Sequence, residues 1–580
     1  MAANTAACTV AEYLAIRLRE IGAEHVFTVP GDYCAPFLEV LDRTPGIERV
    51  PNINELGCGY AADGYARFKG AGAACVQYGV GSFSLLNSVA GSFVEFVPVA
   101  IISSSPGAPD RLLEKKQNIL FHHSTGDLRG DQRVFANATV ASVVITEACT
   151  APAEIDGALT RMLTLRRPVY IEVINSVWKQ ACPPPSGSLK ARPCHSDPAS
   201  LNQAVEAARE FMANAERPVF FFGIELQRFG LQSYAQQLVD VTGIPFTTTS
   251  LAKTVLDESQ PLFAGTYAGP ATVPYTNELV TSSDCVIALG TIITDDYLAL
   301  MASSFARMIR VSHGETRVGI TYFSSVTLPD FLPALLDTLK ARPLPNPQPP
   351  PSLPAPRASG PRPQDSPITF ELFYETLGAF LLEKDARGRF ILILGESTSL
   401  YVFGNLFGLP AESFVAQAAW GSLGHETGSA LGVALATGKR PLVVAGDGGF
   451  MMICQELSSL VRARADAVIF VMSNRVYAIE QAFVDLAAFK PGGHFAPFDE
   501  LPTWDYCALA TAFGARGVRV TNIGELIEFL EILPAPGSGP TLVEVVVPKQ
   551  DLPPQLERLA KTPAPMMKYG RQARARLTIG

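Results

Sequence analysis

The feature that most constrains the fold is a repeated alternation of short apolar runs with longer segments of helical periodicity. Between Glu12 and Val173, the apolar runs include residues 26–29, 74–77 and 169–173. Short strands that alternate with helices build parallel sheets with helices on their faces. We therefore predict an α/β fold of doubly wound parallel sheets.

The chain has 580 residues, of which 48% are hydrophobic, and it is too long for a single core. Two stretches, 183–198 and 342–367, are rich in Pro and Ser and have too little apolar content to bury a core. We predict three domains, at residues 1–182, 199–341 and 368–560. Residues 342–367 would form a linker between the second and the third domain, and residues 561–580 a C-terminal tail. No fixed-period internal repeat is visible.

Charge and composition exclude several classes of function. The net charge of -9 comes with no basic stretch that would follow a phosphate backbone, so we expect no nucleic-acid partner. Residues 1–10 lack the pattern of a signal peptide, and no apolar run reaches the length of a membrane helix, so we expect no membrane segment. Ten scattered cysteines with no C-x-x-C pair suggest neither a disulfide framework nor zinc. We expect a cytoplasmic enzyme that acts on small molecules.

A glycine turn, Gly446-Asp447-Gly448-Gly449, follows the apolar run 441–445 and precedes a segment compatible with a helix. The order of strand, glycine turn and helix is typical of phosphate sites, because glycines let backbone N–H groups approach a diphosphate closely. Taken alone, this motif is equally compatible with a plain turn between a strand and a helix.

Asn474 makes the motif more specific. It lies 27 positions after Asp447, just beyond the apolar run 468–472. If the two runs are adjacent parallel strands, both side chains lie at the same edge of a sheet. A carboxylate, an amide oxygen, a main-chain carbonyl and diphosphate oxygens form an all-oxygen set suited to octahedral Mg²⁺. We predict Asp447 and Asn474 as metal ligands and Gly446, Gly448 and Gly449 as diphosphate contacts.

This combination resembles the signature of the thiamine-diphosphate enzymes, in which G-D-G is followed at this distance by two asparagines. The chain has Ser473-Asn474 there, so the metal-binding asparagine is retained. The resemblance implies thiamine diphosphate and Mg²⁺ as cofactors, and pyrimidine-binding, central and diphosphate-binding domains. It implies the main-chain oxygen of Val476 as a further metal ligand, at a position where relatives usually carry glycine. It also implies cofactor contacts from Thr398, Tyr477, Ala478 and Ile479.

Two further segments resemble the same family. Residues 54–57 and 61–67 match the block with the glutamate that activates the aminopyrimidine ring, which makes Glu55 the candidate; the alternative is a solvated carboxylate at a helix end. Residues 417–424 match the segment that bends thiamine. There Leu423 would separate the two rings and the Gly421 carbonyl would accept from the exocyclic amine, unless Leu423 is ordinary core.

Four residues point to one branch of the family. Asp32, the adjacent pair His122 and His123, and Glu480 resemble the acid and histidine set of the pyruvate and indolepyruvate decarboxylases. The resemblance implies non-oxidative decarboxylation of a 2-keto acid to an aldehyde and CO₂ through a thiamine enamine. Such a reaction needs proton donors and acceptors near neutral pH. Taken singly, a histidine pair is usually solvated and Glu480 could be a surface carboxylate.

Alternatives remain open. A carboligase would form the same intermediate and add a second carbonyl compound, although such synthases usually lack this histidine pair. A catalytically dead relative that serves as a binding subunit is supported only by Ser473 and Val476. Because two subunits form each site in the family, the resemblance implies a homodimer or homotetramer. Residues 395–399, Thr294-Asp295 and Phe483 leave the size of the substrate open.

Overall fold

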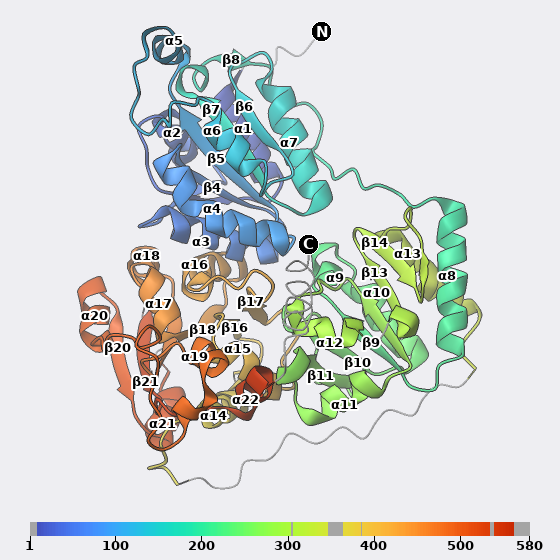
Figure 1. The fold of residues 1–580 in the computed structure, drawn as a ribbon. Coiled ribbons are helices and arrows are strands. Elements are labelled where there is room, and N and C mark those ends of the chain that lie inside the picture. Colours follow the sequence, from blue (N-terminus) through green and yellow to red (C-terminus); the bar gives the residue numbers. More distant parts are fainter. Residues whose placement is uncertain (1–7, 303–304, 346–362, 384–385, 534–538, 562–580) are drawn as a thin grey trace, which may run out of the picture.

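The computed structural model describes residues 8–302, 305–345, 363–383, 386–533 and 539–561. These residues form three α/β domains, each around its own sheet (Figure 1). This architecture confirms the predicted fold class. Much of the predicted linker 342–367 and nearly all of the predicted tail 561–580 lie outside the described residues, and the exact domain limits stay predictions.

The N-terminal domain holds a fully parallel six-stranded sheet in the order β3-β2-β4-β5-β7-β6. Its strands are β2 (His25–Thr28), β3 (Glu48–Pro51), β4 (Gly72–Gln77), β5 (Val99–Ser105), β6 (Ser142–Ile145) and β7 (Val169–Ile174). Its helices are α1 (Val10–Glu20), α2 (Ala35–Arg43), α3 (Glu55–Lys69), α4 (Val80–Val94), α5 (Ala108–Gln117), α6 (Gly130–Phe135) and α7 (Ala151–Leu165). A short antiparallel pair, β1 (Cys8–Thr9) and β8 (Ala181–Cys182), joins the two ends of the domain.

The C-terminal domain repeats this plan in the order β17-β16-β18-β19-β21-β20, again fully parallel. Its strands are β16 (Phe390–Leu394), β17 (Phe414–Ala416), β18 (Arg440–Gly446), β19 (Val468–Ser473), β20 (Arg516–Val520) and β21 (Thr541–Val546). Its helices are α14 (Phe370–Leu382), α15 (Thr398–Val402), α16 (His425–Thr437), α17 (Asp447–Ile453), α18 (Glu456–Arg462), α19 (Ala478–Val484), α20 (Tyr506–Phe513), α21 (Ile523–Glu531) and α22 (Pro554–Lys561).

The central domain differs from a purely parallel sheet at one edge. Its strands are β9 (Pro218–Phe222), β10 (Phe246–Thr249), β11 (Phe263–Tyr267), β12 (Cys285–Leu289), β13 (Met308–Ser312), β14 (Glu315–Val318) and β15 (Thr321–Tyr322), and its larger helices are α8 (Pro198–Ala213), α10 (Gln232–Thr242), α11 (Pro274–Ser282) and α13 (Leu328–Ala341). The strands β13, β14 and β15 pair antiparallel. Only His313 and Gly314 connect β13 to β14, and a parallel pair would need a crossover of a dozen or more residues.

The N-terminal and C-terminal domains share one hydrophobic core, which includes Phe27 and Tyr65 from the first and Ile393 and Val443 from the second. The contact centres on α3 and α16, which lie against each other in Figure 1. Glycine allows this close approach, because a Cβ atom on Gly432 would lie 1.8 Å from the Ala61 carbonyl oxygen. The N-terminal and C-terminal domains of one chain are therefore tightly packed against each other.

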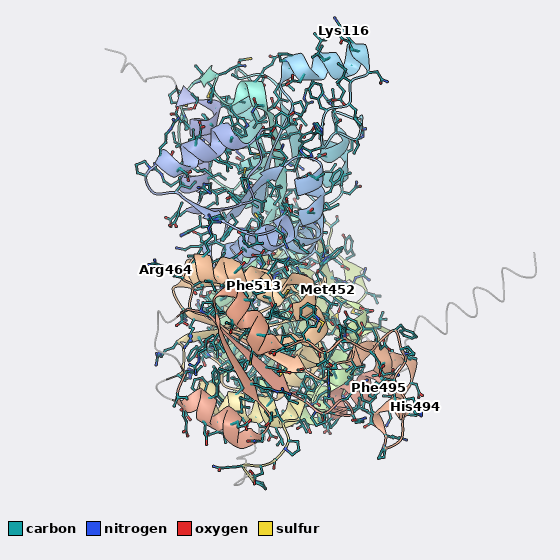
Figure 2. The ribbon with its side chains drawn as sticks, turned by 90° about the vertical axis from the view of Figure 1, so that its left-hand side faces the viewer. Lys116, Met452, Arg464, His494, Phe495 and Phe513 are labelled. Atoms are coloured by element: carbon teal, nitrogen blue, oxygen red, sulfur yellow. The ribbon has the colours of Figure 1, made fainter. Side chains whose placement is uncertain are left out.

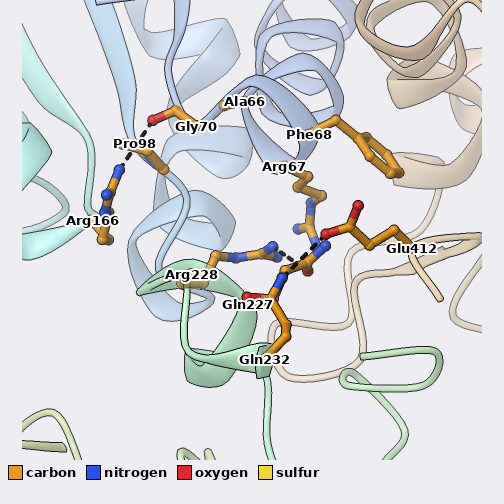
Figure 3. A pocket seen from close by; sticks show the side chains of 11 residues that line it. Ala66, Arg67, Phe68, Gly70, Pro98, Arg166, Gln227, Arg228, Gln232 and Glu412 are labelled. Carbon is orange, nitrogen blue, oxygen red and sulfur yellow. Dashed lines mark hydrogen bonds between the residues drawn. The ribbon is translucent and has the colours of Figure 1, made fainter. Parts of the chain in front are cut away.

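A cavity of about 190 Å³ lies where the three domains meet (Figure 3). Arg67 and Arg166 line it from the N-terminal domain, Arg228 from the central domain and Glu412 from the C-terminal domain. It adjoins the C-terminal end of α3, whereas Glu55 begins the same helix. Since a 15-residue helix is about 22 Å long, this cavity is distinct from the predicted cofactor site.

Among the described residues, no helix is long and apolar enough to cross a membrane. All ten cysteines are free thiols.

Candidate active site

The C-terminal sheet has a topological switch point at the carboxyl ends of β16 and β18, the place where open α/β sheets form a crevice. From β16 the chain moves to β17 on one side of the sheet and then crosses to β18 on the other. Ligands of open α/β sheets bind at such a switch point, because the loops leave the strands in opposite directions there. Gly446 caps α17, and Asp447 is the first residue of that helix. The predicted glycine motif therefore lies at this crevice.

Asp447 and the segment after β19 meet as predicted, because β18 and β19 are adjacent and parallel. The Arg475 N–H donates to Asp447 Oδ2 at 2.6 Å, and the Gly448 N–H donates to Oδ1 at 3.0 Å. From the residues that the structure describes, Asn474 Oδ1 accepts only a long bond of 3.4 Å, donated by the Val476 N–H. No described residue donates a hydrogen bond to the Val476 carbonyl oxygen. Asp447 thus lies against the segment that carries Asn474 and the Val476 carbonyl.

Burial raises the pKa of Asp447 to about 6. A divalent cation would stabilise the ionised carboxylate and offset the free-energy cost of burying its charge. With the amide oxygen of Asn474 and the free carbonyl of Val476, the donor set has the all-oxygen chemistry that Mg²⁺ prefers. The residues present fit the metal that the family signature implies.

The backbone accommodates valine at position 476. The left-handed conformation of this loop falls on Arg475, with φ of 60°, and Val476 itself is buried and pairs with Glu500. Tyr477 lies against the glycine turn, since a Cβ atom on Gly448 would lie 2.2 Å from its ring. Glycine at 448 is therefore required by this contact.

Residues 417–424 form a loop above the crevice. Gly421 has φ of 68°, and Gly424, with φ of 89°, caps α16. Leu423 is half-buried, and a Cβ atom on Gly449 would lie 3.8 Å from its Cδ2 atom. Thr398 is buried at the start of α15, just beyond the carboxyl end of β16. Thr398, Gly421 and Leu423, three predicted cofactor contacts of the C-terminal domain, thus lie near the carboxyl end of β16 and the glycine turn.

The N-terminal domain of the same chain holds this loop in place. Glu95 Oε1 accepts from the Ala419 N–H at 2.9 Å and the Trp420 N–H at 3.2 Å. Asn87 accepts from the Trp420 indole and donates to Ser422 Oγ. The loop conformation at Gly421 and Leu423 therefore depends on Asn87 of α4 and on Glu95, the residue that follows this helix.

Glu95 belongs to a buried ion network. Arg67 bonds Glu95 Oε2 and Asp63 Oδ1, both at 2.6 Å, and His425 Nε2 lies 2.8 Å from Asp63 Oδ1. Despite burial, the pKa of Asp63 is lowered, because Arg67 and His425 stabilise its charge. The network connects α3 and α16 across the domain contact.

We expect Glu95→Ala to lower the free energy of unfolding by about 3–5 kcal/mol, because it leaves the charge of Arg67 buried with one fewer partner. Denaturant unfolding followed by circular dichroism measures the change. Glu39→Ala is the matched control and should cost about 0–1 kcal/mol, since the ion pair of Glu39 with Lys179 is exposed. Equal losses in the two variants would contradict the role of the network.

Asp32, His122 and His123 each contact a residue at the carboxyl end of β4, next to the switch point of the N-terminal sheet. Gln77 Nε2 donates to Asp32 Oδ1 at 2.6 Å. Tyr78, the next residue, donates from its hydroxyl to the His122 carbonyl oxygen at 2.6 Å, and its ring lies 6.0 Å from that of His123. The sequence did not single out Gln77, although it is the last residue of a predicted strand.

Glu55 is the first residue of α3, and Asn54 caps the helix by accepting from the Gly57 N–H. A Cβ atom on Gly81, in the first turn of α4, would lie 3.4 Å from Glu55 Oε1. On the other side, Glu456 of α18 accepts from the Asn54 N–H and the Asn52 amide. Glu55 therefore stands where the N-terminal domain meets the C-terminal domain.

Glu480 lies in the first turn of α19, and partial burial raises the pKa of its carboxyl group. A second acid, Glu396, follows β16 and accepts from the Tyr401 hydroxyl at 3.2 Å. Burial raises the pKa of Glu396 to about 8, with further contributions from the charges of Asp296 and Glu480. Sequence reasoning placed residues 395–399 near the substrate but missed Glu396 as an acid, because burial is not visible in the sequence.

The predicted site residues fall into two groups. Asp447, Asn474, Val476, Tyr477, Ala478, Ile479 and Glu480 follow β18 and β19, whereas Asp32, Glu55, His122 and His123 belong to the N-terminal domain. Among the described residues, no hydrogen bond or ion pair joins one group to the other.

Family models match all three domains. The N-terminal thiamine pyrophosphate binding domain matches residues 8–126, the central domain of the thiamine pyrophosphate enzymes matches 205–339, and the C-terminal thiamine pyrophosphate binding domain matches 400–545.

Relatives match almost the full length of the chain. A probable pyruvate decarboxylase of Schizosaccharomyces pombe is 32% identical, with 94% of each chain covered. An alpha-keto-acid decarboxylase of Mycobacterium leprae is 31% identical over 95% of each chain, and a pyruvate decarboxylase of Kluyveromyces marxianus is 30% identical over 96% of this chain and 98% of its own. Together with the three domain matches and the glycine motif at the sheet crevice, this similarity places the chain in the thiamine pyrophosphate enzyme family.

Proposed function

We propose that this chain catalyses non-oxidative decarboxylation of a 2-keto acid to an aldehyde and CO₂. The observation that carries the proposal is the bond from the Arg475 N–H to Asp447 Oδ2, which brings the two halves of the metal and diphosphate motif together. The similarity to proteins named as pyruvate and alpha-keto-acid decarboxylases supports the choice of reaction.

Asp447, Asn474 and the carbonyl oxygen of Val476 would hold Mg²⁺, which in turn would hold the diphosphate against the N–H groups of the glycine turn. Leu423 and Gly421 would orient the cofactor rings. Thiamine diphosphate, when bound, supplies a carbon nucleophile for the keto carbon and accepts the electrons released as CO₂ departs. Excess Mg²⁺ chelator should therefore abolish cofactor retention.

The acids have separate tasks in this proposal. Glu55 would hold a proton at the aminopyrimidine ring. Glu480 would assist departure of CO₂ and deliver the proton that completes the aldehyde, and the rise in its pKa favours the protonated form that a donor needs. Asp32, with His122 and His123, would take the hydroxyl proton during release, and Gln77 fixes the Asp32 carboxylate by its 2.6 Å bond.

A second copy of the chain would complete the site. The two groups of catalytic residues make no direct bond within the described chain, and exposed apolar side chains border both of them. Ile53 precedes Glu55, Val80 and Phe83 begin α4, and Met452, 52% exposed, lies on α17 after the glycine turn (Figure 2). We propose a homodimer or homotetramer that buries this face, which sedimentation or light scattering would test.

The ten free thiols suit a reducing compartment, and we propose a cytoplasmic location. Fractionation of cells that produce the chain would test it.

Carboligation is the second candidate reaction. It is disfavoured because Glu480, Asp32 and the histidines offer several proton donors, and protonation diverts the shared intermediate toward the aldehyde. Incubation with pyruvate, branched, indole and phenyl keto acids, with and without added aldehyde, tests both reactions. Aldehyde as the main product supports decarboxylation, and an acyloin or acetohydroxy acid as the main product supports the alternative.

We expect Glu480→Gln to slow aldehyde release by about 100-fold while thiamine diphosphate still binds, because glutamine has the same shape but no acidic proton. Steady-state kinetics and cofactor titration measure the two effects. Glu528→Gln, on the exposed face of α21, is the control and should be unchanged. Near-normal turnover of Glu480→Gln would rule out this assignment.

A further inference from the structure

Glu426 is a buried acid at the cofactor crevice that has no role in the account above. It is the second residue of α16 and is 1% exposed. Its carboxyl group lies between the carboxyl end of β16 and the glycine turn. A Cβ atom on Gly395 would lie 2.7 Å from Oε2, and one on Gly449 would lie 3.1 Å from Oε1. The side chain thus occupies the space that glycine leaves open on both walls of the crevice.

One oxygen of this carboxyl group lacks a partner. The N–H groups of Gly424 and of Glu426 itself stabilise the carboxylate, but Oε2 makes no hydrogen bond to any described residue. An unpaired buried oxygen of a carboxyl group is costly, and native structures rarely keep one without a ligand or water. The free oxygen therefore points to a group that enters the crevice from outside the chain.

The surroundings favour the neutral form of Glu426. Burial raises its pKa to about 7, and hydrogen bonds from the two backbone N–H groups oppose the rise only in part. No positively charged group contributes to the shift in the pKa of Glu426. The charged and titratable groups on the elements packed against α16 are Glu55, Cys58, Tyr60, Asp63, Tyr65, Arg67 and Lys69 on α3, Glu396 after β16, Arg440 on β18, Asp447 on α17, Cys454 after it, and Glu456 and Arg462 on α18.

We propose that Glu426 is a positioning residue for thiamine diphosphate, held as a carboxylic acid whose O–H donates a hydrogen bond to the diphosphate end of the cofactor. The N–H groups of the glycine turn already favour an anion there, and an ionised Glu426 would repel that anion. A neutral acid adds a donor to the same cradle. The inference rests on the cofactor alone and does not depend on the reaction.

Proton uptake follows from this arrangement. When the diphosphate binds near Glu426, its negative charge raises the pKa of the acid further, because charge on Glu426 becomes less favourable. Above the pKa of the free enzyme, binding must therefore draw one proton from solution onto a Glu426 oxygen. Affinity for the cofactor is full below that pKa and falls as the pH rises through it.

Titration of the full-length chain with thiamine diphosphate at saturating Mg²⁺ tests the proposal, with binding followed by tryptophan fluorescence and by calorimetry. We expect the dissociation constant of the natural chain to rise roughly tenfold between pH 7 and pH 8.5. Calorimetry in two buffers of different ionisation enthalpy should show uptake of about one proton at pH 8.

Three variants make the test specific. Glu426→Gln keeps a neutral donor of the same shape, and we expect it to bind with little dependence on pH and without the extra proton. Glu426→Ala removes the donor and should bind about tenfold more weakly at pH 6.5, where the acid is neutral. Glu225→Gln is the control: burial raises the pKa of Glu225 to about 7 as well, but in the central domain, so this variant should keep the natural pH profile.

The same pH profile in the natural chain and in Glu426→Gln would overturn the proposal. Weaker Mg²⁺ binding by Glu426→Gln at every pH would also overturn it, because Glu426 would then be an ionised metal ligand. If the natural chain binds no cofactor at any pH, the cofactor assignment fails first, and this inference fails with it.

Discussion

Glu55→Gln should lower the rate of decarboxylation by about 100-fold or more while the fold and the binding of thiamine diphosphate are retained. Glu55 begins α3 at the meeting of the N-terminal and C-terminal domains, with Glu456 bound to the backbone of the neighbouring Asn54. Glutamine keeps the shape of the side chain but cannot carry the proton that activates the aminopyrimidine ring. Steady-state kinetics with a 2-keto acid and cofactor titration measure the two properties separately.

Glu24→Gln serves as the control for this substitution, because Glu24 is an exposed acid of the same domain and its ion pair with Lys69 is long. We expect it to leave the rate unchanged. If Glu55→Gln retains a normal rate, the N-terminal domain of this chain does not activate the cofactor, and the site assignment must move elsewhere.

Asp447→Asn should remove the stabilisation that cofactor and Mg²⁺ give to the folded chain. Ligands at about 100 times their dissociation constant stabilise a protein by about 2.7 kcal/mol, and we expect this increment to disappear. The carboxylate accepts from two backbone N–H groups and, as an anion, attracts the cation. Asparagine has one oxygen and no charge, so it can serve neither role fully.

Thermal denaturation with and without thiamine diphosphate and Mg²⁺ measures the effect. Asp505→Asn is the control, since Asp505 caps α20 through its side chain and asparagine caps equally well. Ligand stabilisation of Asp447→Asn equal to that of the natural chain would contradict its place in the metal site.

The sequence predicted most features that depend on the course of the backbone, such as the order and pairing of the strands around the glycine turn. The apolar run 441–445, the glycine turn and the run 468–472 predicted adjacent parallel strands, and β18 and β19 pair in that way. It did not predict the antiparallel edge of the central sheet, because β14 and β15 have only four and two residues and contain no apolar run.

Side-chain environments were harder to predict. Glu426 and Glu396 look like ordinary helix and loop acids in the sequence, and only the packing of α16 and of the loop after β16 buries them. Gln77 and Glu95 gain their roles from partners that are distant in sequence, Asp32 and the loop at Ala419. The roles proposed for Asp32, Glu55, His122, His123 and Glu480 stay predictions until they are tested by substitution.

The most direct test of the account measures CO₂ and aldehyde released by the purified chain from a 2-keto acid. The account predicts equal amounts of the two products, and release only when both thiamine diphosphate and Mg²⁺ are present. Release that persists without the cofactor, or CO₂ accompanied by a carboligation product in place of the aldehyde, would contradict it.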